Sequence, residues 1–351
     1  MSRLRTSALK LAMQKVRTTL QVACLLLLWA ASSSCAFPIS RQIGSYHQRQ
    51  KNGLTVYTPV EGDAREIQAP SVEEKKMVAQ LAEAGRLGNW AQVDRMIRRY
   101  TGSHTAVLSA AMQAATRCRK YREGAEVFKR LRQCEDSMDL PAYTVAMKLL
   151  GKLGRVEVVE ELWSELVQNS KVNKVLAQAR IDAAASNGDI DAAFDVLRYM
   201  EEETVEIGLT HYVSAIDACS KSKELGKMAS AHVLFKEIMD RGLTPNIITY
   251  TNLLRASRDG SDEDLLALLA DMKTAGVKAD AIFVENLILA FVKKPAGERW
   301  TSSNAVAQLK LLPSSRLENA KMILADFREQ GIHFNKVCVL IEDALAILRP
   351  E

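Results

Sequence analysis

The chain has 351 residues, of which 48% are hydrophobic, 25% charged and only 6% aromatic. A substantial core is therefore possible, and the scarcity of aromatic residues and proline favours a helical fold. Eight of the 47 basic residues precede Glu61, the first acidic residue, which leaves 39 basic and 42 acidic residues in 61–351, a net charge of −3. Strong non-specific attraction of this part to nucleic acid is not expected unless its charges are sorted onto one face.

The first 36 residues are predicted to be a signal peptide. They are basic and lead into an apolar run at 22–31, VACLLLLWAA, which is too short to span a bilayer comfortably. Small residues at Ser34 and Ala36 fit a cleavage site before Phe37. Residues 37–69 have no acid before Glu61, and they are predicted to be a transit peptide and linker.

The junction reads SCAFP and resembles the bipartite leader of algae with secondary plastids. This resemblance implies a plastid location and no membrane span in the mature chain. The alternatives are a mitochondrial protein, a secreted protein, or a membrane anchor if the apolar segment is not cleaved.

Residues 70–349 are predicted to form an array of helix-turn-helix repeats. Five units of similar length follow one another without gaps, and each has an apolar helix, a break and a second helix. Weaker units flank them, the later one with a polar insertion at 294–315 that we expect to be a surface loop. A lone helix at 336–349 is expected to cap the stack. The units are 70–104, 105–139, 140–173, 174–208, 209–246, 247–280 and 281–335.

Stacking such helix pairs buries the apolar face that no pair can bury alone. The sequence therefore predicts an all-α fold, a right-handed alpha-alpha superhelix (α-solenoid) of about seven helix-turn-helix repeats. Its long concave surface would be suited to binding.

The clearest units resemble the pentatricopeptide repeat family. The resemblance rests on Thr249-Tyr250-Thr251 and on the endings GVKAD at 276–280 and GLTPN at 242–246. It covers about 70–349 and is most specific in 140–280. It implies sequence-selective binding of single-stranded organellar RNA, about one base per repeat, in RNA processing, stability or translation.

In that family each base is read by one residue in the first turn of the first helix and by the last residue of the repeat. The resemblance assigns these roles to Ser109 with Asp139, Thr144 with Asn173, Gln178 with Gly208, Val213 with Asn246, Thr251 with Asp280, and Glu285 with Asn335. A hydroxyl with Asn implies adenine, and a hydroxyl with Asp implies guanine. The repeats at 105–139 and 247–280 would then read guanine and the repeat at 140–173 adenine. The other three pairs depart from the family's code and are left unassigned.

Two further sets share a repeat position. Mostly apolar residues three before each first-turn reader would sandwich the bases: Ala106, Pro141, Val175, Thr210, Ile248 and Ile282. Basic residues near the first-helix ends would contact phosphates: Arg117, Lys152, Lys221, Arg258 and Lys293. For the polar readers the alternative is a purely structural role, because such residues are also common helix caps and loop residues.

No catalytic site, cofactor or metal is expected. The five histidines are scattered, and the sequence has neither a Cys-x-x-Cys pair nor a glycine-rich phosphate loop. Two alternatives to RNA binding by the array alone remain. One is a tetratricopeptide-like scaffold for other proteins, favoured by the net charge of −3, and the other is a subunit of an RNA-processing or ribosomal assembly.

Overall fold

The computed structural model describes residues 69–134, 138–169, 172–293 and 301–348, all within one unit that spans 67–351. The leader predicted over 1–36 and 37–69 lies outside the described residues, apart from Ala69. The described part of the chain consists of sixteen α-helices without a strand, so the predicted all-α fold class is confirmed. None of these helices is both long enough and apolar enough to cross a membrane.

The helices alternate between two roles along the chain. The first helices of successive repeats are α3 (Val72–Arg86), α5 (Thr105–Arg117), α7 (Leu140–Lys152), α9 (Lys174–Asn187), α11 (Leu209–Lys221), α13 (Ile247–Ala256) and α15 (Ala281–Phe291). The second helices are α4 (Trp90–Arg99), α6 (Tyr121–Arg132), α8 (Val156–Asn169), α10 (Ile190–Glu202), α12 (Lys227–Asp240), α14 (Asp262–Thr274) and α17 (Ser314–Glu329). From α5 onwards, the first helices begin at the residues where the sequence units begin.

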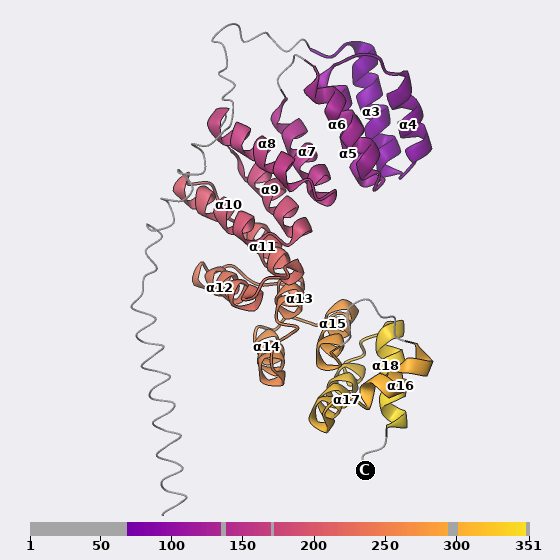
Figure 1. Cartoon of the computed structure of the whole chain (residues 1–351), viewed down its shortest axis with the longest axis vertical. Helices are drawn as coiled ribbons and strands as arrows, with labels where there is room; N and C mark the ends of the chain where they lie inside the picture. Colours follow the sequence, from indigo (N-terminus) through magenta and orange to yellow (C-terminus); the bar gives the residue numbers. More distant parts are fainter. Residues whose placement is uncertain (1–68, 135–137, 170–171, 294–300, 349–351) are drawn as a thin grey trace, which may run out of the picture. The chain divides into compact units, whose positions relative to one another are not determined.

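Each first helix packs against the first helix of the next repeat and against its own second helix (Figure 1). We call the continuous stack from α3 to α15 the first-helix row. One hydrophobic cluster runs through all the repeats, and it includes the fully buried Met147, Tyr212, Tyr250 and Phe283. The described residues therefore form an α-solenoid, in which neighbouring repeats share a core.

Small residues allow the first helices to approach each other closely. A Cβ atom added at Gly151 of α7 would lie 2.6 Å from the Cα atom of Ala183 in α9. A Cβ at Gly85 of α3 would lie 2.8 Å from the Cα atom of Ala114 in α5. Any side chain at either glycine would therefore push two successive repeats apart.

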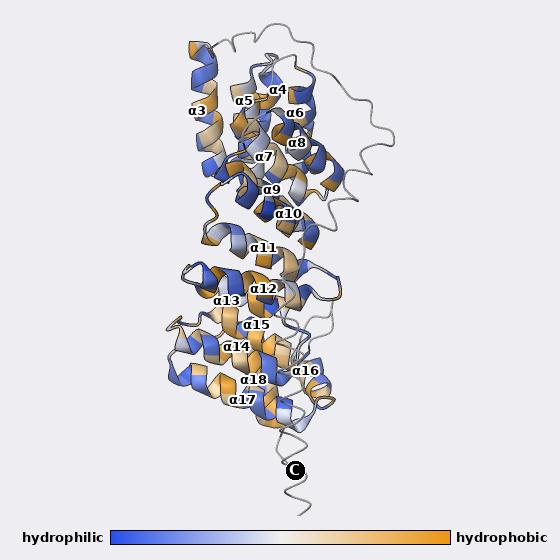
Figure 2. Cartoon of the chain, turned by 90° about the vertical axis from the view of Figure 1, so that its left-hand side faces the viewer, coloured by the Kyte–Doolittle hydropathy of each residue, from blue (hydrophilic) through white to orange (hydrophobic). Residues whose placement is uncertain are grey.

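The C-terminal end departs from the simple alternation. The single helix α18 (Lys336–Ile347) follows α17, and α15 packs among α13, α17 and α18. Helix α15 is hydrophobic around most of its circumference, as its colour in Figure 2 shows. This composition suits a helix that has neighbours on several sides.

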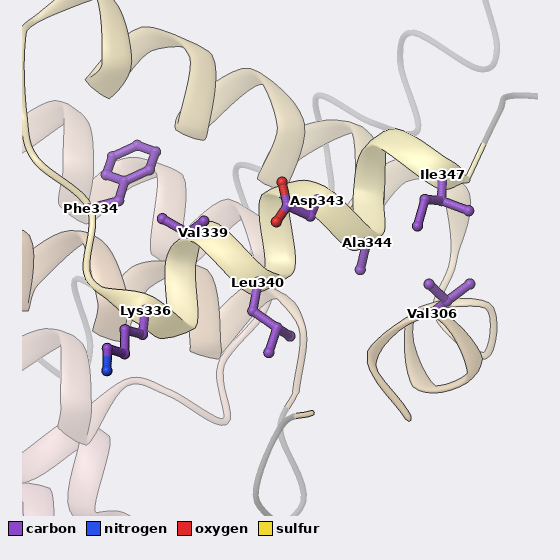
Figure 3. Close-up of a pocket in the computed structure, with 8 residues that line it drawn as sticks. All are labelled: Val306, Phe334, Lys336, Val339, Leu340, Asp343, Ala344 and Ile347. Carbon is purple, nitrogen blue, oxygen red and sulfur yellow. The ribbon is translucent and has the colours of Figure 1, made fainter. Parts of the chain in front are cut away.

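The prediction of a surface loop over 294–315 was wrong for residues 302–309, which form helix α16 (Ser302–Leu309). Ala305 and Leu309 lie one turn apart and are buried, and α16 packs against α18. Figure 3 shows Val306 of α16 near Ile347 of α18, at the edge of an open pocket of about 310 Å³. The apolar spacing within an otherwise polar insertion is thus explained by this contact.

Candidate nucleic-acid interface

The predicted readers at the repeat ends are the N-caps of the following first helices. In each case a side-chain oxygen accepts a hydrogen bond from a backbone N–H group in the first turn. These residues are Asp139, Asn173, Asn246, Asp280 and Asn335. Gly208 occupies the same place without a side chain, and its N–H group donates to Nδ1 of His211 at 3.1 Å. The cap position is therefore common to all six pairs.

Capping fixes which polar group each side chain has left for a ligand. Oδ1 of Asn173 accepts from the N–H groups of Val175 and Leu176, both at 3.0 Å, so the amide Nδ2 remains as a donor. Oδ1 of Asp280 accepts from Phe283 N at 2.7 Å, so its second carboxylate oxygen remains as an acceptor. Asp139 is bonded in the same way, to Ala142 N at 2.8 Å.

The first-turn hydroxyl groups donate backwards along their own helices. Oγ1 of Thr144 donates to the carbonyl oxygen of Leu140 at 2.9 Å, and Oγ1 of Thr251 donates to that of Ile247 at 2.7 Å. With the hydroxyl proton engaged, each oxygen is available to an outside group only as an acceptor. Thr144 is half-buried, whereas Thr251 is 9% exposed. Ser109, at the same repeat position, is 8% exposed.

The pairs that depart from the family's code have fewer hydrogen-bonding groups free for a ligand. Nε2 of Gln178 donates to Oδ1 of Asp182 at 2.7 Å and to Oγ of Ser214 at 2.9 Å. Nδ2 of Asn335 donates to Oε2 of Glu285 at 2.6 Å, so the two members of this pair bind each other. Val213 has no polar group at all. In these repeats the first-turn residue is engaged within the protein or cannot form a hydrogen bond.

Large aliphatic side chains at one repeat position are exposed on the first-helix row. Val175, Ile248 and Ile282 follow the first residue of α9, α13 and α15, and they are 55%, 56% and 60% exposed. Pro141 and Thr210 at the equivalent positions are also exposed, and Ala106 is half-buried. Three repeats therefore expose a large apolar side chain at the position that was predicted to contact bases.

The basic residues that were predicted to contact phosphates differ in exposure and in whether they already bind a group of the protein. Lys221 Nζ lies 2.5 Å from Oδ2 of Asp217, and Nη1 of Arg117 donates to the carbonyl oxygen of Ala82 at 3.4 Å. Lys152 is exposed, and it makes no ion pair or hydrogen bond with the residues that the structure describes. Lys293 is exposed as well, and Arg258 is half-buried.

Four charged residues of the first-helix row were not predicted to belong to the site, although Asp182 and Asp217 fit the resemblance to the pentatricopeptide repeat family. Lys148 Nζ lies 3.2 Å from Oδ2 of Asp182, and Nη1 of Arg255 lies 3.4 Å from Oδ1 of Asp217. Each is the ninth residue of its unit. A comparison of the ninth residues down the array would have shown opposite charges at equivalent positions in neighbouring repeats.

Lys148, Lys152 and Lys221 line one shallow pocket of about 200 Å³ on the first-helix row, together with Asp182 and Asp217. Within the described ranges, no three His, Cys, Asp or Glu side chains are placed to hold a metal ion.

Comparisons with known proteins agree with the repeat pattern. A pentatricopeptide repeat domain model matches residues 233–294, and a PPR repeat model matches residues 141–170 and 179–205. A pentatricopeptide repeat-containing protein of Arabidopsis thaliana is 23% identical over 262 residues, which are 72% of this chain and 43% of the relative.

Solved structures of low identity are similar as well. Maize PPR10 has 18% identity and a TM-score of 0.44, over 79% of this chain and 42% of PPR10. PPR10 in complex with an 18-nt psaJ RNA element has 20% identity and a TM-score of 0.46, over 76% of this chain and 43% of that one. Nuclear proteinaceous RNase P 2 of A. thaliana has 14% identity and a TM-score of 0.43, over 59% and 46%.

The chain spans less than half the length of each of these relatives. The family matches support repeats of the pentatricopeptide type in the matched stretches between residues 141 and 294.

Proposed function

We propose that the chain binds single-stranded RNA along the first-helix row and reads bases with the pairs Ser109 with Asp139, Thr144 with Asn173, and Thr251 with Asp280. The observation that carries this proposal is the shared register of the interface. A capping Asn or Asp and a first-turn hydroxyl recur at fixed repeat positions in these three pairs, and Thr144, Thr251 and Asp280 lie within stretches that match pentatricopeptide repeat models.

The available hydrogen-bonding groups match the proposed bases. Thr144 and Asn173 offer one acceptor and one donor, which complement the amino group and the ring nitrogen acceptor of adenine. Thr251 and Asp280 offer two acceptors, which complement the ring N–H and the amino group of guanine. Ser109 and Asp139 carry the same kinds of group, but the Ser109 hydroxyl oxygen is buried and has no hydrogen-bond partner among the described residues, so its side chain would have to rotate to bind a base.

Selection from a pool of random single-stranded RNA at low salt tests this function. One base per repeat gives the expected pattern GANNG, in either direction along the chain. The purified chain should enrich that pattern, and replacing both Thr144 and Asn173 by alanine should remove the preference for adenine. A chain that retains no RNA, or a double variant with an unchanged preference, would overturn the proposal.

We also propose that the protein works in a plastid and acts on organellar transcripts by occupancy. A bound protein can block nucleases or keep a site unpaired without any chemical step. Residues 1–69 fused to a fluorescent protein should direct it to the plastid of an alga with a secondary plastid. Fluorescence in mitochondria or in the medium would contradict this location.

A second candidate function is a scaffold for other proteins of such assemblies. It is favoured by a groove of about 720 Å³ that is lined by residues of α6, α7 and α8, among them Phe128, Leu150 and Val158. Under this alternative, proteins that co-purify with the chain should stay bound after ribonuclease treatment. Their release by ribonuclease would instead support RNA binding.

A further inference from the structure

Two aspartates join successive repeats on the first-helix row. Asp182 of α9 accepts a hydrogen bond from Ser214 of α11 at 2.9 Å as well as the bond from Gln178, and its other oxygen pairs with Lys148 of α7. Asp217 of α11 pairs with Lys221 of the same helix and with Arg255 of α13. We call these contacts the carboxylate network. It links four consecutive repeats, from 140–173 to 247–280.

The network lies where the phosphates of a bound RNA are expected. Lys148 and Lys221 line the same pocket as Lys152, which is one of the predicted phosphate contacts. The side chains of Asp182 and Asp217 are 33% and 23% exposed, so they border the surface that a ligand would reach. Each carboxylate therefore binds cations that an RNA phosphate could otherwise bind.

We propose that Asp182 and Asp217 stand in for phosphates, which makes the repeats at 174–208 and 209–246 a gap in the RNA footprint. This inference rests on the proposed RNA binding. A phosphate that approached Lys148 or Lys221 would have to replace an anion that is already bound. The exchange releases few counterions and gains little affinity, because one negative charge merely replaces another. Gln178 is held by the same network, and it is thereby kept from a base.

The inference is tested by replacing both carboxylates with amides of the same shape. In the full chain, D182N/D217N should bind single-stranded RNA of mixed sequence more tightly than the wild type does. The plot of log affinity against log salt concentration should also become steeper, by roughly 0.7 for each additional phosphate bound by a freed cation. Thermal unfolding of the variant should be measured alongside, to show that it is folded.

A matched control changes the net charge equally at another place. Asp326 pairs with Lys273 at 2.7 Å, and Glu342 pairs with Arg328 at 2.6 Å, on the helices α14, α17 and α18. D326N/E342Q should leave the salt dependence as it is in the wild type. A control variant that steepens as much as D182N/D217N would show that only net charge matters, and it would overturn the inference.

A second pair of variants decides the matter even if the amide variant does not fold. If Lys148 is masked, K148Q/D182N, which removes this ion pair without changing the net charge, should bind RNA as the wild type does, whereas K152Q should bind more weakly. Weaker binding by K148Q/D182N would overturn the inference, since it would place a phosphate on Lys148 in the wild type. If the wild type binds RNA but the variants give the contradicting results, only the footprint gap is wrong. If no form binds RNA, the wild type included, the proposed function is wrong as well.

Discussion

The repeats at 140–173 and 247–280 differ from the two repeats between them in the state of their polar groups. All four have the same helical framework, and each first helix begins after a residue at the same cap position. In the outer two, a threonine oxygen and a capping Asn or Asp keep hydrogen-bonding capacity for a ligand. In the central two, Gln178 and Lys221 are engaged within the protein, and Val213 has no polar group.

This comparison shows that a repeat can have the regular helical geometry and still lack polar groups that are free to bind a base. A capping Asn or Asp stabilises the helix that follows it, whether or not its first-turn partner can bind a base. A repeat of regular geometry is therefore not sufficient evidence of a base-reading repeat. The first-turn threonines of the outer repeats bond only to their own helices, whereas the amide nitrogen of Gln178 also bonds to Ser214 of the next repeat.

The largest effect is expected where an outer and a central repeat meet. In Gly151→Val, the new side chain would overlap the backbone of Ala183, and we expect a loss of about 3 kcal/mol in the free energy of unfolding. Denaturant unfolding measures this loss. Gly208→Ala is the control, because a Cβ there meets only Nδ1 of His211, at 4.0 Å, and it should cost less than about 1 kcal/mol. Equal losses would contradict the close packing of α7 and α9.

An intermediate effect is expected on base preference. Asn173→Asp preserves the cap and exchanges the outward donor for an acceptor, so the preferred base at this repeat should change from adenine to guanine. The discrimination should be about tenfold, within the roughly 1–3 kcal/mol of a good pair of hydrogen bonds. Affinities for RNAs that differ at one base measure it. In the central repeats, Asn246→Asp should have little effect, since Val213 offers no second bond. Similar changes at both sites would remove the distinction between the regions.

The smallest effect is expected from the exposed aliphatic residues. Ile248→Ser should weaken RNA binding by a few fold, roughly 1 kcal/mol or less, through the loss of apolar contact with a base. Because Ile248 is 56% exposed, the free energy of unfolding should hardly change. Val233→Ser on the second helix α12 is a matched control at 51% exposure, and it should leave RNA affinity unchanged. An equal loss in both variants would indicate a general effect of surface polarity.

Some features of the candidate site follow directly from the repeat register. The capping residues Asp139, Asn173 and Asp280 could be placed at helix starts, because each repeat ends where the next apolar helix begins. The resemblance to the pentatricopeptide repeat family implied that Ile248 and Ile282 contact bases, but the apolar pattern alone could not show that they are exposed. Helix α16 was missed because its few apolar residues lie within a polar insertion.

The sequence by itself determined the helical class and the positions that are equivalent from repeat to repeat. These features depend on local periodicity and on residues close together in the chain. The tertiary structure alone decided which equivalent side chains are still free to bind a ligand. Whether Lys148 is free depends on Asp182, and one bond of Gln178 depends on Ser214; both partners belong to another repeat, whereas Lys221 pairs with Asp217 of its own helix. Contacts between residues more than thirty positions apart arise only when the repeats stack.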